Sequence, residues 1–400
     1  MAIEVLKFGG TSVKDAECLT NVANIIAKRV AEKKQLVVVV SAQGKFTDIL
    51  QEKADEITNF PNKREMDVLL SCGEQITTAL LAMELQTRGI PAVSLSGWQA
   101  GIKTDANHTN ARIKKIKTDR ILNELDRGKV IIVAGFQGLS KLDEITTLGR
   151  GGSDTTAVAL ACALFADSCN IYTDVDGVYT CDPRVVKTAK MLDDISYDEV
   201  LEMASLGANV LHNRCVEIAK NYSMPIYVKS SFKDNRGTKI TEVGSMEKLL
   251  ISGVACDNNI ACVSLFGIDK KASEFKIFSL LAKEGINVDV ILKSFSEGDK
   301  NVAFTVSKTD LDKTQEIIAT NLEALGATDV GYATDKSKVS LVGSGMAINA
   351  GVAAKTFELL SENSIKVDMI STSEIKISLI VDESKAEKAV KILHEEFLES

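Results

Sequence analysis

The sequence is poor in the residues that most often carry metal or redox chemistry. It has only three histidines, His108, His212 and His394, in 400 residues. Its eight cysteines are scattered along the chain and include no Cys-x-x-Cys pair. We therefore expect no His-based metal site, catalytic triad, zinc site or disulfide framework. The cysteines are interpreted as reduced, mostly buried thiols of a cytosolic protein.

Positive charge and long apolar runs are also scarce. The formal net charge is -8 at pH 7 and the pI is about 5.2. This balance argues against nucleic acid or an anionic membrane surface as the main partner, although a small anionic ligand still fits a local basic pocket. The start MAIEVLKFGG lacks the basic and apolar regions of a signal peptide. No apolar run approaches the roughly 18 residues that cross a bilayer, so we expect a cytoplasmic protein.

Residues 1–250 alternate short, continuously apolar segments with amphipathic helix patterns. The segments IEVLKF, QLVVVVSA and KVIIVAGF are typical of strands covered on both faces. Between the first two, apolar residues recur at steps of three and four over residues 14–32, as in a helix. This alternation predicts an α/β fold with a mainly parallel sheet. Ligands of such folds bind beyond the carboxyl ends of the strands.

Residues 251–400 contain an internal repeat. IFSLLAKEGINVDVI (277–291) aligns with TFELLSENSIKVDMI (356–370), and each copy is followed by a further strand pattern and a helix pattern. With the strand before it, each copy matches a βαββαβ, ferredoxin-like unit. We interpret the pair as a regulatory tail, although a role in oligomerisation alone remains open. The predicted domains are 1–250, 251–330 and 331–400.

The first candidate for chemistry is KFGGTS. Gly9 and Gly10 let the backbone approach a bound group, and consecutive N–H groups can hold an anion. Lys7 adds a cation at the same strand end, and Thr11 and Ser12 add hydroxyls. These residue types suit phosphate oxygens, although a plain structural turn also explains the glycines.

The second candidate is TTLGRGGSDTTA. Ser153 or Asp154 would be an ordinary N-cap for the helix that follows, but a cap does not explain Arg150 among three glycines. Arginine binds carboxylates through two parallel hydrogen bonds, and bare backbone leaves room for a ligand. We therefore expect Arg150 to bind a carboxylate and Asp154, if it is not the cap, an ammonium.

Two further segments carry polar residues at positions where a ligand could bind. Glu74 lies in the apolar stretch LLSCGEQITTALLA, where it either faces a cleft or lies on the helix surface. YTDVDGVYTCDPR follows a strand, and its Asp174, Tyr179 and Arg184 suit a nucleotide. A solvated hairpin is the alternative, because Asp-Gly is itself a turn signal.

Taken together, KFGGTS, LLSCGE, TDANHTNARI, GFQG, TTLGRGGSDTTA and YTDVDGVYTCDPR resemble the motifs of the aspartokinase family, in the family's order. The resemblance implies an amino-acid kinase domain, a three-layer α/β sandwich, followed by two ACT domains. It implies that ATP phosphorylates the side-chain carboxylate of L-aspartate to give 4-phospho-L-aspartate and ADP, which opens the route to lysine, threonine and methionine. A carboxylate nucleophile is already ionised at neutral pH, so no general base is needed.

The resemblance also implies roles for individual residues. Lys7, Arg150 and Asp154 are the catalytic set, with Lys7 bridging the ATP γ-phosphate and the attacking carboxylate. The substrate-binding set is Ser41, Thr47, Glu74, Arg150, Ser153 and Asp154. The nucleotide-binding set is Lys7, Gly9, Gly10, Ser12, Thr173, Asp174, Tyr179, Arg184 and Lys233. The cofactor would be ATP with Mg²⁺, the metal being carried on the nucleotide phosphates, mostly without protein ligands of its own.

For the repeated tail, the resemblance implies binding of an amino-acid effector at the first unit. Val288 and Asp289 are the expected effector-binding residues, and a solvated Asp at the end of a strand is the alternative. We expect feedback inhibition by lysine first and threonine second. We also expect a homodimer or homotetramer formed through the ACT domains.

Two other functions fit the sequence less well. A kinase of glutamate, N-acetylglutamate or UMP on the same fold is disfavoured, because such chains usually lack the paired tail and the GRGGSD segment. A non-catalytic amino-acid sensor is disfavoured by the intact Lys7, Arg150, Asp154 and Asp174. The length also leaves no room for a fused homoserine dehydrogenase.

Overall fold

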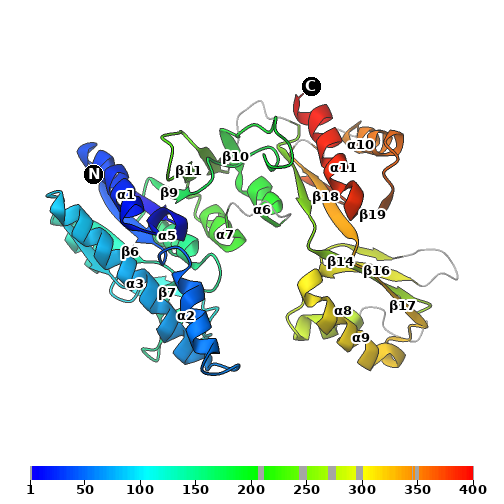
Figure 1. Cartoon of the computed structure of the whole chain (residues 1–400), viewed down its shortest axis with the longest axis horizontal. Coiled ribbons are helices and arrows are strands. Elements are labelled where there is room, and N and C mark those ends of the chain that lie inside the picture. The colour runs from blue at the N-terminus through cyan, green and yellow to red at the C-terminus, as the bar shows by residue number, and fades with distance from the viewer. Residues whose placement is uncertain are drawn as a thin grey trace. The chain divides into compact units, whose positions relative to one another are not determined.

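The computed structural model describes residues 2–205, 211–242, 250–268, 276–293, 301–344, 346 and 351–399. It divides into two compact units (Figure 1). The first unit holds Met1–Val178, Met191–Ala204 and Asn209–Met246, and the second holds Tyr179–Lys190, Ser205–Ala208 and Glu247–Ser400.

The first unit is built on an eight-stranded sheet in the order β10-β12-β11-β9-β1-β2-β6-β3. Neighbouring strands are parallel except β11 and β12. The strands are β1 (Ile3–Phe8), β2 (Gln35–Val40), β3 (Ala92–Leu95), β6 (Val130–Ala134), β9 (Ser168–Thr173), β10 (Asp194–Ser196), β11 (Ile226–Ser230) and β12 (Thr238–Thr241). The helices are α1 (Ala16–Ala31), α2 (Phe46–Asp55), α3 (Lys63–Thr87), α4 (Asp119–Asp126), α5 (Gly152–Ala163), α6 (Tyr197–Ser205) and α7 (Asn213–Asn221).

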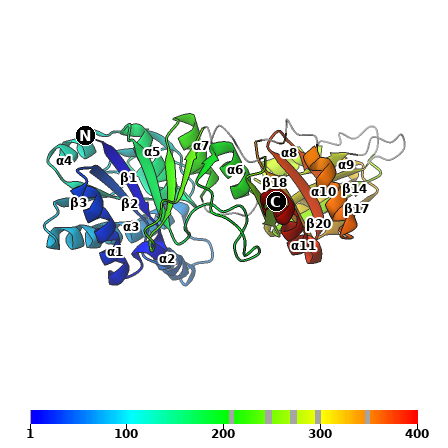
Figure 2. The same cartoon turned by 90° about the horizontal axis from the view of Figure 1, so that it is seen from above.

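Helices cover both faces of this sheet (Figure 2). On one face, α1 and α3 pack against Leu6, Phe8 and their neighbours in a single core cluster. On the other face, α5 packs against β1, β2 and β9. Successive side chains of a strand point to opposite faces, so Lys7 lies on the face opposite Leu6 and Phe8, which is the α5 face. The period of the strand therefore directs the ammonium of Lys7 toward α5.

A smaller four-stranded sheet, β5-β4-β7-β8, packs against α3. Its strands are β4 (Ile102–Thr104), β5 (Ile113–Ile116), β7 (Gln137–Leu139) and β8 (Ile145–Thr147). By length and hydropathy, α3 is the one helix of the described residues that could cross a membrane. It packs instead against α1, α2, β3, β6 and β8, and its apolar residues contribute to the core.

The second unit contains two ferredoxin-like sheets, in the orders β15-β16-β14-β17 and β13-β18-β20-β19. Its strands are β13 (Gly253–Asp257), β14 (Ile260–Phe266), β15 (Ile291–Lys293), β16 (Val302–Ser307), β17 (Asp329–Ala333), β18 (Lys336–Val342), β19 (Val367–Thr372) and β20 (Lys376–Asp382). Its helices are α8 (Lys276–Lys283), α9 (Leu311–Leu325), α10 (Gly351–Glu362) and α11 (Glu383–His394). A small apolar cluster that includes Ile260, Met369 and Ile380 joins the two modules.

The predicted division into 251–330 and 331–400 treats the two modules as consecutive in sequence. In the structure they are not consecutive. Strand β13 precedes the first module, yet it pairs with β18 and completes the second sheet. The first module, β14 to β17, is therefore inserted between strands of the second. Hydrogen bonding to β18 decides this placement, and a strand pattern alone does not reveal its partner.

The predicted boundary at residue 250 also differs from the structure. Residues 179–190 belong to the second unit, where Cys181 and Val186 pack in the core of the second module. The backbone N–H of Val254 donates to the carbonyl of Thr180 at 2.8 Å. The chain thus passes from one unit to the other more than once before residue 250.

Candidate active site

A buried ion pair lies at the carboxyl end of β1. The Nζ atom of Lys7 is 2.6 Å from Oδ1 of Asp154 on α5, and both side chains are largely buried. The sheet register and the start of α5 bring together two residues that the sequence analysis had singled out separately. The ammonium is thereby held at the edge of the sheet where ligands of parallel α/β folds bind.

The glycines after Lys7 allow a close approach between two loops. A Cβ atom on Gly10 would lie 2.9 Å from the carbonyl oxygen of Ala42 and 3.1 Å from that of Gly44. The N–H of Gly44 donates to the carbonyl of Gly10 at 2.9 Å. Any side chain at Gly10 would push these loops apart, so glycine is required by contact here and not only by the turn.

Glu74 is a buried carboxylate that faces the same loops. Its side chain accepts a hydrogen bond from the N–H of Ala42 at 3.2 Å through Oε1. Its other oxygen, Oε2, is buried and has no hydrogen-bond partner among the described residues. Burial raises the pKa of the Glu74 carboxyl to about 8, and the donation from Ala42 offsets this only in part. Gly73 permits the approach, because a Cβ there would lie 2.7 Å from Cβ of Ala42.

The start of α5 leaves Ser153 and Asp154 free of a capping role. The N-cap is Gly151, in the left-handed region at φ 65°, and the cap makes no side-chain hydrogen bond. Ser153 packs closely on the turn after β6, since a Cβ on Gly135 would lie 2.7 Å from its Oγ. Arg150 is exposed and makes no hydrogen bond or ion pair with any residue that the structure describes. Its guanidinium is therefore available to a carboxylate ligand.

Some of the predicted nucleotide residues lie near this edge. Ser12 Oγ is 2.5 Å from Ser231 Oγ, and the hydroxyl of Thr173 donates to Asp174 at 3.0 Å. Lys233 lies 2.7 Å from Asp176. A polar cavity of about 300 Å³ beside α1 is lined by Ser231 and Lys233 but not by Lys7 or Asp154. The cavity is therefore adjacent to the predicted nucleotide set and does not contain the ion pair.

Comparison with known proteins shows the family of the chain. The model of the amino acid kinase family matches residues 2–230, and an ACT domain model matches residues 339–397. An aspartokinase of Geobacillus stearothermophilus is 52% identical over 400 residues, which cover 99% of this chain and 97% of that protein. Aspartokinase 2 of Bacillus subtilis is 50% identical over 402 residues, which cover 99% and 98%. The chain belongs to the aspartokinase family. It is therefore an aspartate kinase, a phosphotransferase with a carboxyl group as acceptor.

Solved aspartokinase structures agree with this assignment. E. coli aspartokinase III in complex with aspartate and ADP superposes with a TM-score of 0.82 at 28% identity, covering 100% of both chains. The same E. coli enzyme in complex with lysine and aspartate superposes with a TM-score of 0.79, covering 99% of both chains. The family resemblance, the fold class and the enzyme class predicted from the sequence are thus confirmed.

Not every predicted site residue of this aspartate kinase lies in the first unit. Tyr179 and Arg184 lie in the segment 179–190 of the second unit, where Arg184 is exposed and pairs with Asp182 at 2.7 Å. Ser41 lies directly after β2, and Thr47 lies in the first turn of α2. Both are half-buried, close in sequence to the loop that Glu74 contacts.

The expected effector residues lie in the first module of the second unit. Val288 packs at the edge of that module's core. The carboxylate of Asp289 is half-exposed and pairs with Lys338 on β18, whose side chain is buried. An effector ammonium at Asp289 would share the carboxylate with this lysine.

The sequence analysis missed residues that form hydrogen bonds to the loops next to the candidate site. Arg214 donates to the carbonyls of Leu148 and Ala111 at 2.9 and 2.7 Å. Asp67, which is fully buried, binds the loop that precedes Ala111. The motif TDANHTNARI marked this loop, but its partners are far away in sequence.

Proposed function

We propose that this aspartate kinase transfers the γ-phosphoryl group of ATP to the side-chain carboxylate of L-aspartate, giving 4-phospho-L-aspartate and ADP. The observation that carries the proposal for the substrate is the unpartnered, buried Oε2 atom of Glu74. An amino-acid ammonium supplies the missing donor, and the exposed guanidinium of Arg150 supplies a fork for the α-carboxylate. These two groups orient an amino acid without using its side-chain carboxylate.

Lys7 is positioned to act on the transferred group. Its ammonium is fixed by Asp154, so it needs little reorganisation when charge moves during transfer. Gly9, Gly10 and Ser12 follow it and suit phosphate oxygens, because bare backbone permits close approach. Thr173, Asp174, Tyr179, Arg184 and Lys233 complete the proposed nucleotide set. MgATP supplies the phosphoryl group, and its metal is carried on the phosphates.

Ser41, Thr47, Ser153 and Asp154 complete the proposed substrate set. Asp154 has two tasks in this proposal, since it holds Lys7 and accepts from the substrate ammonium. A carboxylate has four lone-pair directions, so one group can serve both cations.

The second unit is proposed to bind a feedback inhibitor, lysine first and threonine second, at Val288 and Asp289. A ligand shifts an equilibrium only if it binds one conformation more tightly than the other. The product would serve the biosynthesis of lysine, threonine and methionine in the cytoplasm.

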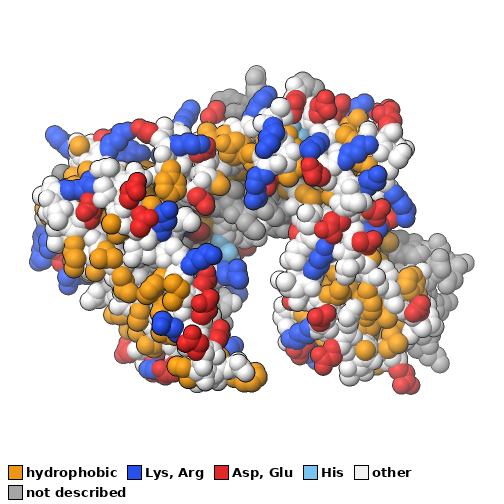
Figure 3. Space-filling view, viewed as in Figure 1, with side chains coloured by type: hydrophobic (Ala, Val, Ile, Leu, Met, Phe, Trp, Pro, Cys, Tyr) orange, Lys and Arg blue, Asp and Glu red, His pale blue; other side chains and the backbone are white. Residues whose placement is uncertain are grey.

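A homodimer or homotetramer through the ACT modules is also proposed. Ile291 and Leu292 are exposed in β15, and Ile370 is exposed in β19. Each of these strands is at the edge of its sheet. Exposed apolar edge strands invite pairing with another chain. Hydrophobic side chains also gather on the visible face of the first module (Figure 3).

The substrate proposal is tested by an ADP-release assay with L-aspartate, L-glutamate, N-acetylglutamate and UMP. Activity confined to aspartate supports it, and a preference for any other acceptor contradicts it. The single variants Glu74→Gln and Arg150→Gln should each raise the half-saturating aspartate concentration and leave the half-saturating ATP concentration unchanged.

A test of the effector proposal must take into account the ion pair between Asp289 and Lys338. Asp289→Ala alone would strand a buried lysine and change stability as well as the pocket. The double variant Asp289→Ala/Lys338→Met removes both charges together. Calorimetric titration of lysine and threonine should show weaker binding to the double variant than to the parent. Unchanged binding would remove Asp289 from the pocket.

A further inference from the structure

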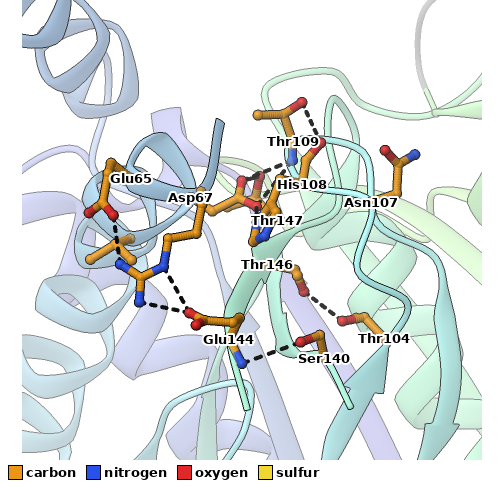
Figure 4. Close-up of polar contacts among 12 residues, drawn as sticks. Glu65, Asp67, Thr104, Asn107, His108, Thr109, Ser140, Glu144, Thr146 and Thr147 are labelled. Atoms are coloured by element: carbon orange, nitrogen blue, oxygen red, sulfur yellow. Dashed lines mark hydrogen bonds and ion pairs between the residues drawn. The ribbon is translucent and has the colours of Figure 1, made fainter. Parts of the chain in front are cut away.

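Asp67 is a fully buried carboxylate in the second turn of α3, and the proposed mechanism does not use it. Its two oxygens accept from the backbone N–H of Thr109, each at 3.1 Å, and Oδ1 accepts from the hydroxyl of Thr147 at 2.5 Å. Oδ2 lies 2.7 Å from Nδ1 of His108. Figure 4 shows the carboxylate between these three residues, at the centre of a polar cluster. Asp67 thus ties one helix to a loop and to the end of β8.

The loop that Asp67 holds has an unfavourable backbone at its centre. Thr109 has φ 68°, in the left-handed region that β-branched residues rarely adopt. Such a conformation persists only where the surroundings impose it. Asp67 constrains this conformation from outside the loop, because it accepts from the N–H of Thr109 and contacts the ring of the neighbouring His108. Loss of the carboxylate therefore releases the loop at its strained residue.

The same loop packs against the turn that presents Arg150. A Cβ atom on Gly149 would lie 3.2 Å from both the carbonyl oxygen of Thr109 and Oδ1 of Asn110. The N–H of Ala111 donates to the carbonyl of Thr147 at 2.9 Å. Loop and turn therefore form one packed unit, and Arg150 is the next residue after the contact.

Glu74 follows Asp67 by seven residues on α3, so the two carboxylates lie on the same face of the helix, two turns apart. We propose that Asp67 is a positioning residue, which fixes the loop of residues 105–111 against Gly149 and so sets the spacing between Arg150 and Glu74. It thereby determines the affinity for the amino-acid substrate. This inference rests on the proposed roles of Arg150 and Glu74.

The test is Asp67→Asn, which keeps the shape but turns one acceptor oxygen into a donor that faces N–H and O–H groups. We expect the half-saturating aspartate concentration to rise roughly tenfold or more. The half-saturating ATP concentration and the maximal rate should stay within about threefold of the parent values. A merely structural role would lower the amount of active enzyme and leave the half-saturating concentration unchanged.

Glu124→Gln is the matched control. Glu124 is a buried carboxylate of the same unit, 3% exposed, with Arg120, Arg127 and Lys129 as partners. It lies on α4, before β6 begins, and therefore at the opposite edge of the sheet from the site. Its loss should lower the melting temperature without changing the aspartate requirement. If it changes the aspartate requirement as much as Asp67→Asn does, the inference is wrong.

Two more variants keep the test decisive if Asp67→Asn does not fold. Thr147→Val removes one bond to Asp67, and Gly149→Ala pushes the loop from the other side. Each should raise the aspartate requirement selectively, and an unchanged requirement in both refutes the inference. Arg150→Lys separates this inference from the proposed function. If Arg150→Lys leaves the aspartate requirement unchanged, the proposed function fails; if it raises the requirement while the Asp67 variant does not, only the inference fails.

Discussion

Ionisation of Glu74 should make aspartate binding depend on pH. Burial raises the pKa of this carboxyl to about 8 from an ordinary value of 4.5, so the free enzyme holds Glu74 mainly as the neutral acid at pH 7. If Glu74 receives the substrate ammonium, the ionised form is the competent one. Aspartate binding must then release a proton from Glu74, and raising the pH should strengthen binding.

The magnitude follows from the fraction that is ionised. With a pKa of about 8, roughly one molecule in eleven is competent at pH 7 and about half at pH 8. The free energy lost to deprotonation at pH 7 is therefore about 1.4 kcal/mol. The half-saturating aspartate concentration should fall about fivefold between pH 7 and pH 8.

Two measurements check this prediction. Steady-state titration of aspartate at saturating ATP from pH 6.5 to 8.5 gives the affinity profile, and Glu74→Gln should abolish its slope. Calorimetry in two buffers of different ionisation enthalpy should detect about 0.9 proton released per aspartate bound at pH 7. A flat profile in the parent enzyme, or no proton release, would refute the role of Glu74.

Three other perturbations follow from the same site. Lys7→Ala should lower the maximal rate about a hundredfold in an ADP-release assay, while Lys220→Ala, which removes a surface ion pair of the same unit, should not. Gly10→Ala places a Cβ 2.9 Å from the carbonyl of Ala42 and should cost about 1–3 kcal/mol of stability, measured by urea unfolding, with a matching loss of activity. Because folding raises the pKa of Glu74, the favourable contribution of this group to the free energy of unfolding is complete below pH 4.5 and is lost as the pH rises through about 8. The melting temperature of Glu74→Gln should therefore fall less steeply with pH than that of the parent between pH 6 and pH 8.

The sequence was most informative where the chemistry is local. KFGGTS and GRGGSD each combine a charge with glycines, and such turns are recognisable without knowledge of the rest of the fold. The alternation of strands and helices predicted a mainly parallel sheet with ligands beyond the carboxyl ends of its strands. The sequence analysis did not predict the ion pair between Lys7 and Asp154. Its length and its burial depend on the packing of α5 and were not predictable.

Domain boundaries were less predictable, because they depend on which distant segment offers a partner. The sequence analysis did not identify β13 as a strand, and its pairing with β18 depends on an open edge some eighty residues later. Residues 179–190 follow the turn signal Asp176-Gly177, and the sequence analysis assigned them to the first domain. Their Cys181 and Val186 are buried by helices and strands of the second module. A cut at residue 250 would remove that cover, so a truncated chain is a poor test of regulation.

The contrast between Glu74 and Asp67 shows what a sequence pattern can reveal about buried charge. Glu74 was noticed because it interrupts an apolar stretch in the middle of a helix, where a carboxylate needs a reason. Asp67 lies near the start of the same helix, in a polar stretch where an acidic residue is ordinary. Its burial is caused by a loop and a strand that fold back over it, and both of these come later in the sequence. A carboxylate near the start of a helix is therefore informative only once its partners are known, and for Asp67 those partners are the neighbours of the turn that carries Arg150.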